Sequence, residues 1–195
     1  MNDAMSDHQG SAAGHEMRRF AYAPLAEDDD ARIRALWGRP PINLYRILGH
    51  QPSILRAWTE WNNELRHGCE LPRALRELIF LRSAHLQASA YEWTQHVAMA
   101  RKAGLTEHKI EATKGDPSSS DLDDRERAIL RATSGIKDGH LSDVAFAALR
   151  AVFSAGEMIE VIVTASHACM LARVIQAVGV STAGEDPAAA REGAD

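Results

Sequence analysis

The chain has 195 residues, of which 45% are hydrophobic and 25% are charged, and its formal net charge is −5 at pH 7. This length and composition are typical of one soluble globular domain with a real hydrophobic core. The acidic balance argues against a broad nucleic-acid-binding surface, which would need clustered Lys and Arg, so we expect no nucleic-acid partner. The two cysteines, Cys69 and Cys169, fit no metal-binding or redox spacing and are expected to be reduced thiols in a cytoplasmic protein.

The two ends of the chain differ in composition from the part between them. Residues 1–20 are rich in polar and small side chains without periodicity, and residues 183–195 are similar, which predicts a disordered tail at each end. The N-terminus lacks the apolar stretch of a signal peptide. We therefore expect residues 21–182 to form a single folded domain.

Helix-start and helix-stop residues follow one another along this domain. Acidic residues precede the first predicted helix, Pro52 and Pro72 suit the first turns of two others, and Gly104 ends the helix that follows them. In chain order, the predicted helices begin near Ala31 and end by Gly38; cover Ser53–His67; begin at Pro72; run from Ser89 to Gly104; begin at Thr106 and close before Gly115; and cover Asp123–Lys137, Ser142–Phe153 and Glu157–Val178.

The last of these segments is the most apolar part of the chain. Its β-branched run from Ile159 to Thr164 could also form a buried strand. The apolar pattern extends over some twenty residues, too long for an ordinary strand, so we expect a helix. Glu160 and Arg173 interrupt the pattern, which favours a buried helix over a membrane span and predicts no membrane partner. The expected fold is all-α, a compact bundle of about seven or eight helices.

The octapeptide from Ser89 to His96 is the most informative stretch for function. On a helix, Ser89, Glu92 and His96 share one face, because side chains three and four positions apart are neighbours. A hydroxyl, a carboxylate and an imidazole on one face can move protons. A Glu four residues before a His is also a common solvated pair, and that alternative stays open.

Three segments together resemble the carboxymuconolactone decarboxylase family, which includes the alkylhydroperoxidase D group: Leu71–Arg82, Tyr91–His96 and Ala103–Thr106. The resemblance extends from about Gly38 to Val180 and implies an alkylhydroperoxidase D-like helical fold. Redox members of this family carry Cys-x-x-Cys-x-x-x-His on the motif helix. Here Ser89 and Glu92 stand at the two cysteine positions, and neither side chain can form a disulfide or a thiolate.

The decarboxylase branch is more similar, since its members carry a Glu four residues before the motif histidine. This resemblance implies a catalytic set of His96, Glu92 and Glu77 that needs no metal or organic cofactor. Glu92 would fix the tautomer of His96, which would act as a general acid or base. Glu77 matches the family's upstream glutamate and would be a second acid or an orienting group; a structural ion pair is its alternative.

Four further side chains are candidates for substrate binding, namely Arg82, Ser89, Tyr91 and His85. Arg82 would bind a carboxylate bidentately, and Tyr91 would donate a hydrogen bond to a carbonyl group. Arg73 could bind a carboxylate in the same way, but a surface arginine is its favoured interpretation, and that alternative stays open for Arg82. The structural alternatives for the other two are a helix N-cap for Ser89 and a satisfied core histidine for His85. The histidines form no H-x-x-x-H or HExxH pattern, so we expect no metal.

These observations predict a cofactor-free acid–base enzyme of the decarboxylase, lyase or isomerase type. Its substrate would be a small oxygenated acid or lactone of aromatic or secondary catabolism. A thiol-dependent alkylhydroperoxidase (peroxiredoxin-type) stays open as an alternative, and it would need Cys69 or Cys169 in the site. A non-catalytic binding protein is a third hypothesis. The resemblance also implies a homo-oligomer, whether dimer, trimer or hexamer.

Overall fold

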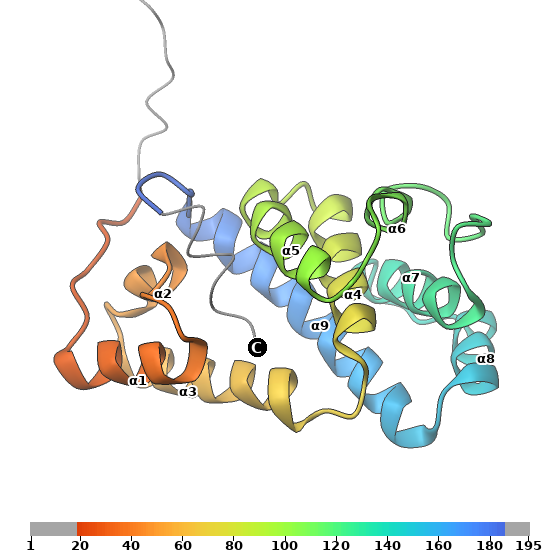
Figure 1. Cartoon of the computed structure of the whole chain (residues 1–195), viewed down its shortest axis with the longest axis horizontal. Helices are drawn as coiled ribbons and strands as arrows, with labels where there is room; N and C mark the ends of the chain where they lie inside the picture. Colours follow the sequence, from red (N-terminus) through yellow and green to blue (C-terminus); the bar gives the residue numbers. More distant parts are fainter. Residues whose placement is uncertain (1–18, 186–195) are drawn as a thin grey trace, which may run out of the picture.

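The computed structural model describes residues 19–185. Nearly all of the tail predicted at 1–20 and most of that predicted at 183–195 therefore lie outside the described residues. Within the described range the chain forms nine α-helices and one π-helical turn, and no strand (Figure 1), which confirms the all-α prediction. The elements are α1 (Glu27–Trp37), α2 (Asn43–Leu48), α3 (Pro52–Asn63), η1 (Glu64–Gly68), α4 (Arg73–Leu86), α5 (Ala90–Lys102), α6 (Glu107–Ala112), α7 (Asp124–Lys137), α8 (Asp143–Val152) and α9 (Ala155–Val178).

All eight predicted helices are present, and the best capped ones begin close to where the sequence predicts. Asp123 caps α7 and Ser154 caps α9, each in a reciprocal capping box with the Glu three residues later. Helix α1 begins at Glu27, earlier than expected, because its four acidic residues form the first turn itself. Helix α2 is the one element that the sequence analysis missed.

The helices form two groups with separate hydrophobic cores. Figure 1 shows α1, α2 and α3 at one end of the molecule and α6, α7 and α8 at the other, with α4, α5 and α9 between them. The larger core joins α4 through α9 and contains the fully buried Leu78, Ile129 and Val161. The smaller core joins α1, α2 and α3 to the first turn of α5 and the last turns of α9. The two cores meet around Phe80.

Helix α9 is long and apolar enough to cross a membrane by length and composition, and it is the one such helix among the described residues. Of its most apolar stretch, 56% is buried inside the protein. Residues such as Ala165 and Ala168, which are fully buried, let α9 pack closely against α4 and α7. The whole run from Ile159 to Thr164 is helical, as the length of the apolar pattern predicts.

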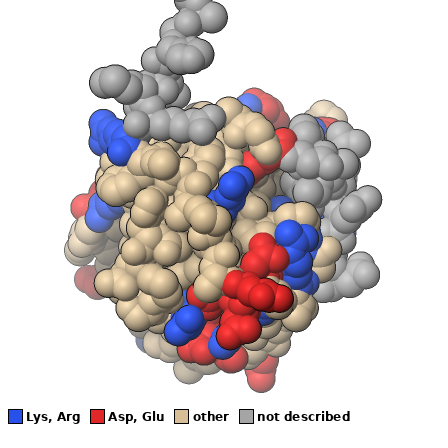
Figure 2. All heavy atoms as spheres, turned by 90° about the vertical axis from the view of Figure 1, so that its left-hand side faces the viewer, with Lys and Arg blue, Asp and Glu red and all other residues tan. Residues whose placement is uncertain are grey.

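Figure 2 shows the end of the molecule that carries α1 and α2. Acidic side chains gather at its lower right over the start of α1, whose first turn consists of Glu27, Asp28, Asp29 and Asp30. Most of the remaining described surface on this side is uncharged, with scattered basic and acidic residues. This face therefore combines one larger acidic region with a broad neutral area.

Candidate active site

A cavity of about 100 Å³ lies between the two cores. Helix α4 contributes Arg73, Arg76, Glu77 and Phe80, which fall on one stripe because they are three or four positions apart. Helix α5 contributes a second stripe, and side chains of α1, α2, α3, η1 and α9 complete the wall. The cavity is thus enclosed by the motif helix, by the helix before it and by the N-terminal group of helices.

A buried hydrogen bond in this cavity joins His96 to Glu77. The Nδ1–H of His96 donates to Oε2 of Glu77 at 2.8 Å, and both side chains are buried. The ring of Phe80 stacks on the imidazole with centroids 4.1 Å apart and planes 9° apart. Arg73 lies 3.8 Å from the other oxygen of Glu77. The carboxylate and the stacked ring fix the tautomer and the orientation of His96, which leaves Nε2 as the nitrogen able to exchange a proton.

This arrangement corrects the expected partner of His96. The sequence predicts that Glu92 orients the imidazole, but no hydrogen bond joins them, and neither oxygen of Glu92 has a hydrogen-bond partner among the described residues. Glu92 lines the cavity although only 1% of it is exposed. Burial raises the pKa of Glu92 well above its ordinary value. A carboxyl in this environment stays protonated to higher pH and can act as a proton donor.

Ser89 occupies the N-cap position of α5 without making the capping bond that was one of its expected roles. Its hydroxyl is buried and has no hydrogen-bond partner of ordinary geometry among the described residues. It lies near enough to Glu92 to favour the charged carboxylate and so to oppose the rise in the pKa of Glu92. Ser89 therefore belongs to the surroundings of Glu92, behind the cavity wall.

Four arginines line the cavity, namely Arg39, Arg66, Arg73 and Arg76. The carboxyl groups that line it are those of Glu77 and Glu92. Arg76 donates to the backbone carbonyls of Leu71 and Arg66 at 2.7 and 2.8 Å. Burial lowers the pKa of Arg66 and of Arg76, and the positive charge of Arg73 adds to both shifts. A guanidinium group remains charged after such shifts, so the wall favours an anionic ligand.

Two predicted substrate-binding residues lie elsewhere. Arg82 is buried between α4 and α7 and donates to the Ser134 hydroxyl at 3.0 Å and to the carbonyls of Thr113 and Gly115, both at 2.8 Å. His85 is exposed, and its ring lies 6.4 Å from that of Trp93. Neither side chain lines the cavity. Arg82 therefore joins helices and a loop, and the cavity arginines stand where a carboxylate-binding cation was expected.

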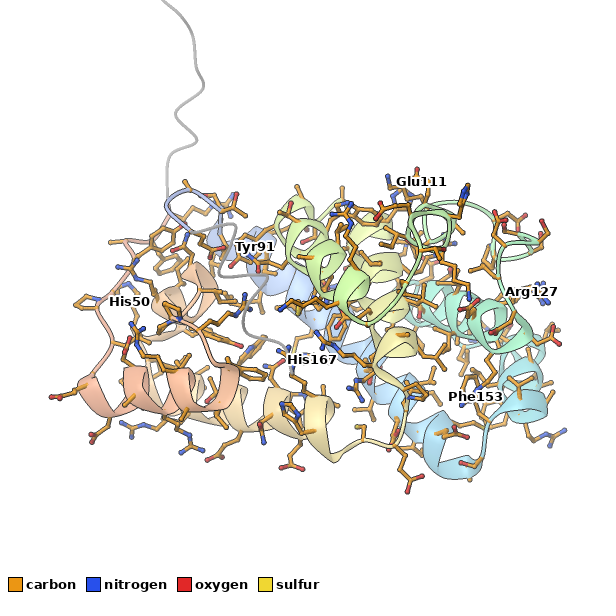
Figure 3. All side chains as sticks on the ribbon, in the orientation of Figure 1. His50, Tyr91, Glu111, Arg127, Phe153 and His167 are labelled. Carbon is orange, nitrogen blue, oxygen red and sulfur yellow. The ribbon has the colours of Figure 1, made fainter. Side chains whose placement is uncertain are left out.

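Tyr91 does line the cavity, on the side of α5 that faces α2 (Figure 3). Its hydroxyl donates to Oε1 of Glu185 at 2.7 Å. Burial and the adjacent carboxylate raise the pKa of Tyr91, so the hydroxyl stays protonated. Gln95, one turn further along α5, donates from Nε2 to the other oxygen of Glu185 at 2.6 Å.

His167 lies in the middle of the molecule, where Figure 3 shows it between α9 and α3. Its Nδ1 accepts from the indole N–H of Trp61 at 3.2 Å, and its Nε2 is 3.0 Å from Oδ1 of Asn62. Burial, and secondarily the nearby His96, lowers the pKa of His167 to about 4. His167 is therefore a neutral ring that ties α3 to α9. No group of three or more potential metal ligands occurs within residues 19–185.

Neither cysteine lines the cavity. Cys169 is buried on α9, and the Ser83 hydroxyl donates to its sulfur at 3.8 Å. Burial raises the pKa of both Cys169 and Cys69. Both sulfurs are free thiols with weakened acidity, which is the opposite of an activated nucleophile.

Several cavity residues escaped the sequence analysis. Arg73 was interpreted as a surface residue, although its spacing from Glu77 places it on the same stripe of α4. Gln95 directly precedes His96 in the motif, and that proximity was the available signal. Arg39 and Arg66 lie in segments without a recognisable motif, and only the folded chain brings them to the cavity. Glu185 does not line the cavity, but its hydrogen bonds to Tyr91 and Gln95 likewise depend on the folded chain.

Comparison with known proteins finds a family match in the part of the chain that contains Glu77, Glu92 and His96. Residues 52–135 match the model of the carboxymuconolactone decarboxylase family, a span that includes Glu77, Glu92 and His96. No curated protein matches the sequence. A Ralstonia eutropha protein described as an uncharacterized peroxidase-related protein with an alkylhydroperoxidase AhpD core aligns with a TM-score of 0.75 and 19% identity, covering 91% of this chain and 98% of that one.

Two further solved structures share the fold. An Agrobacterium tumefaciens protein of unknown function, described as a candidate AhpD-type antioxidant defence protein, has 25% identity and a TM-score of 0.64 over 69% of this chain and 93% of its own. The debrominase Bmp8, solved with 2,3,4-tribromopyrrole, has 19% identity and a TM-score of 0.70 over 88% and 95% of the two chains. The fold is thus shared among proteins with different described activities.

Proposed function

The chain belongs to the carboxymuconolactone decarboxylase family, and from this premise we propose that it is a cofactor-free acid–base enzyme of the decarboxylase, lyase or isomerase type. Its substrate is a small oxygenated acid or lactone. The observation that carries the proposal is one cavity wall that holds a hydrogen-bonded His96–Glu77 pair and a buried carboxyl, Glu92, without a hydrogen-bond partner among the described residues.

In the decarboxylase form of the proposal, the bond between the substrate carbon and its carboxylate breaks and CO2 leaves. The electron pair remains on that carbon as an enolate conjugated with the neighbouring carbonyl group. The Glu92 carboxyl gives its proton to the carbon, and the resulting carboxylate takes a proton back from water. The arginines of the wall lower the energy of the enolate, since fixed positive charge near developing negative charge is the most effective form of stabilisation.

His96 acts as the base in this proposal, whereas Glu92 acts as the acid. Its Nε2 accepts a proton from a substrate hydroxyl or an acidic carbon, while Glu77 stabilises the imidazolium that forms. An isomerase or lyase reaction would use both groups, with His96 as base and Glu92 as acid. The two roles require that Glu92 be protonated and His96 be neutral in the resting protein.

A panel of small lactone acids tests the proposal. Turnover is measured with the wild type, with His96→Ala and with His108→Ala, whose exposed imidazole on α6 is remote from the cavity. We expect His96→Ala to lose activity by about 100-fold or more and His108→Ala to keep it. Equal rates for the wild type and His96→Ala would refute a catalytic role of this histidine.

A thiol peroxidase is the second candidate, favoured by the structural relatives that are described as peroxidase-related. It would require Cys69 or Cys169 to reach the cavity, although burial holds the pKa of both thiols above its ordinary value. A variant with both cysteines changed to Ser decides the question. Loss of peroxide turnover in this variant would establish the thiol mechanism, and retention of it would exclude that mechanism.

We propose in addition that the protein is a cytoplasmic homo-oligomer. Large apolar side chains are exposed on three helices: Ile54 and Trp61 on α3, Val144 and Phe146 on α8, and Ile159 and Met170 on α9. Exposed groups of this size favour burial against a further subunit. Light scattering coupled to size-exclusion chromatography measures the mass, and a 21.4 kDa species at all concentrations would contradict the proposal.

A further inference from the structure

The side chain of Glu185, the last described residue, is hydrogen-bonded to two residues that line the cavity, Tyr91 and Gln95. Glu185 accepts three hydrogen bonds: from the Tyr91 hydroxyl at 2.7 Å and the backbone N–H of Asn43 at 2.5 Å on Oε1, and from Gln95 Nε2 at 2.6 Å on Oε2. Tyr91, Gln95 and Asn43 are each more than nine-tenths buried. These donors come from α2 and α5, and together they form a preformed receptor for a carboxylate.

The chemistry of the three donors is specific. All are uncharged N–H or O–H groups, and the raised pKa of Tyr91 keeps its hydroxyl protonated and able to donate. They satisfy both oxygens of one planar anion, which an alcohol or an amide could not reproduce with the same three contacts. The carbonyl oxygen Oε1 of Gln95 is buried without a hydrogen-bond partner within the described part of the chain, so one acceptor at this place remains available to a ligand.

This receptor lies beside the acid–base residues. Tyr91 and Gln95 are four positions apart and form one row along α5. Glu92 and His96, the residues that directly follow them in the sequence, form a second row. Successive residues of a helix are rotated by about 100°, so the two rows are adjacent, and all four side chains line the same cavity. A ligand whose carboxylate was held by the first row would extend its neighbouring carbon atoms towards the second.

We propose that Tyr91, Gln95 and the backbone N–H of Asn43 form the carboxylate subsite of the substrate, and that Glu185 occupies it until a substrate acid displaces it. The ligand class is a small carboxylic acid whose carboxylate binds in this subsite and whose remaining atoms lie near His96 and Glu92. The inference rests on the proposed function only in identifying this ligand as the substrate, because the binding itself needs no turnover.

Calorimetric titration with benzoate, and with uncharged benzamide of similar shape, tests the subsite in the full-length protein. Glu185→Ala frees the receptor, and a competitor that fills a site nine times in ten weakens apparent affinity about tenfold. We therefore expect Glu185→Ala to bind benzoate about tenfold more tightly than the wild type, with benzamide affinity little changed. The double variant Glu185→Ala, Tyr91→Phe should bind benzoate about tenfold more weakly than Glu185→Ala alone, because one hydrogen-bond donor is lost.

The controls separate the possible failures. Glu111→Gln, an exposed change at α6, should leave benzoate affinity at the wild-type value. The subsite would be refuted by equal benzoate affinity in the wild type and Glu185→Ala, by an equal gain for benzamide, or by no effect of Tyr91→Phe. His96→Ala should keep benzoate binding, so undiminished turnover in His96→Ala together with intact benzoate binding would overturn the proposed function and leave the subsite standing.

Discussion

Replacement of Glu92 by Gln removes one ionisable proton from the cavity and keeps the size of the side chain. Glu92 is 1% exposed, and its oxygens have no hydrogen-bond partner among residues 19–185. Burial raises the pKa of this carboxyl well above its ordinary value. The folded protein therefore holds the Glu92 proton to a higher pH than the unfolded chain does, and stability must depend on pH through this residue.

The sign and size of this dependence follow from proton linkage. The unfolded chain releases the Glu92 proton near pH 4.3. Between that pH and the raised pKa of the folded protein, the folded state binds one proton more than the unfolded state. The free energy of unfolding then falls by about 1.4 kcal/mol for each unit that the pH rises. Below about pH 4.3 the group is protonated in both states, and its contribution becomes constant.

Urea unfolding of the wild type and Glu92→Gln at several pH values measures the effect. Gln cannot titrate, so the stability of Glu92→Gln relative to the wild type should increase by about 1.4 kcal/mol between pH 5 and pH 6. Glu111→Gln, in which an exposed carboxylate paired with Lys114 is changed, should show no such slope. A stability difference between Glu92→Gln and the wild type that is the same at all pH values would refute the raised pKa of Glu92.

The titration of His167 changes the free energy of unfolding with pH in the opposite direction to that of Glu92. Its pKa is lowered to about 4 in the folded protein, against about 6.5 for an ordinary histidine. Between these values the unfolded chain holds a proton that the folded protein lacks, so stability falls as the pH falls through this window. The contributions of Glu92 and His167 therefore offset each other in the wild type between about pH 4.3 and 6.5. Removing the titration with His167→Gln should leave a stability that falls with rising pH, opposite to Glu92→Gln.

Three further predictions concern the neighbouring residues. Glu77→Gln should lower turnover of a lactone acid about 100-fold or more, because the imidazolium of His96 loses its carboxylate, and full activity would contradict the pairing. Ser89→Ala should shift the alkaline loss of activity to higher pH, because the Ser89 hydroxyl lowers the pKa of Glu92; an unchanged pH–rate profile would exclude Glu92 as proton donor. Arg82→Ala should reduce the free energy of unfolding in urea by about 3 kcal/mol or more, because the Ser134 hydroxyl and two backbone carbonyls lose their donor, while the KM of the folded protein stays unchanged; a variant of wild-type stability would contradict this structural role.

The helices could be predicted from sequence where local chemistry determines them. Asp123 and Ser154 each begin a helix with a reciprocal capping box, and such a start depends on residues only three positions apart. Helix α2 has no such signal: Ile42 at its N-cap makes no side-chain bond, and the helix has six residues. It is stabilised by distant contacts instead, because Asn43 donates to the chain near residues 181–185 and Tyr45 is buried in the smaller core.

The sequence predicts that His96, Glu92 and Glu77 lie together at one cavity, but it does not predict which carboxylate pairs with His96. Sequence spacing favours Glu92 as the partner of His96, because both lie one turn apart on α5. The packing of α4 against α5 brings Glu77 to the imidazole instead, and nothing in the local sequence records that crossing. Glu185 reaches Tyr91 across 94 positions of the chain, which is beyond any local pattern.

The division into two cores has a consequence for how this protein can diverge. The segment shared with the family begins at residue 52 and contains Glu77, Glu92 and His96, whereas Trp37, Leu44 and Tyr45 of the cavity wall lie before it. Those three residues belong to the smaller core and are not members of the larger one. Mutations in α1 and α2 can therefore reshape the cavity without replacing any residue of the larger core and without changing Glu77, Glu92 or His96. If the proposed function holds, changes of substrate should accumulate between the start of α1 and the end of α2.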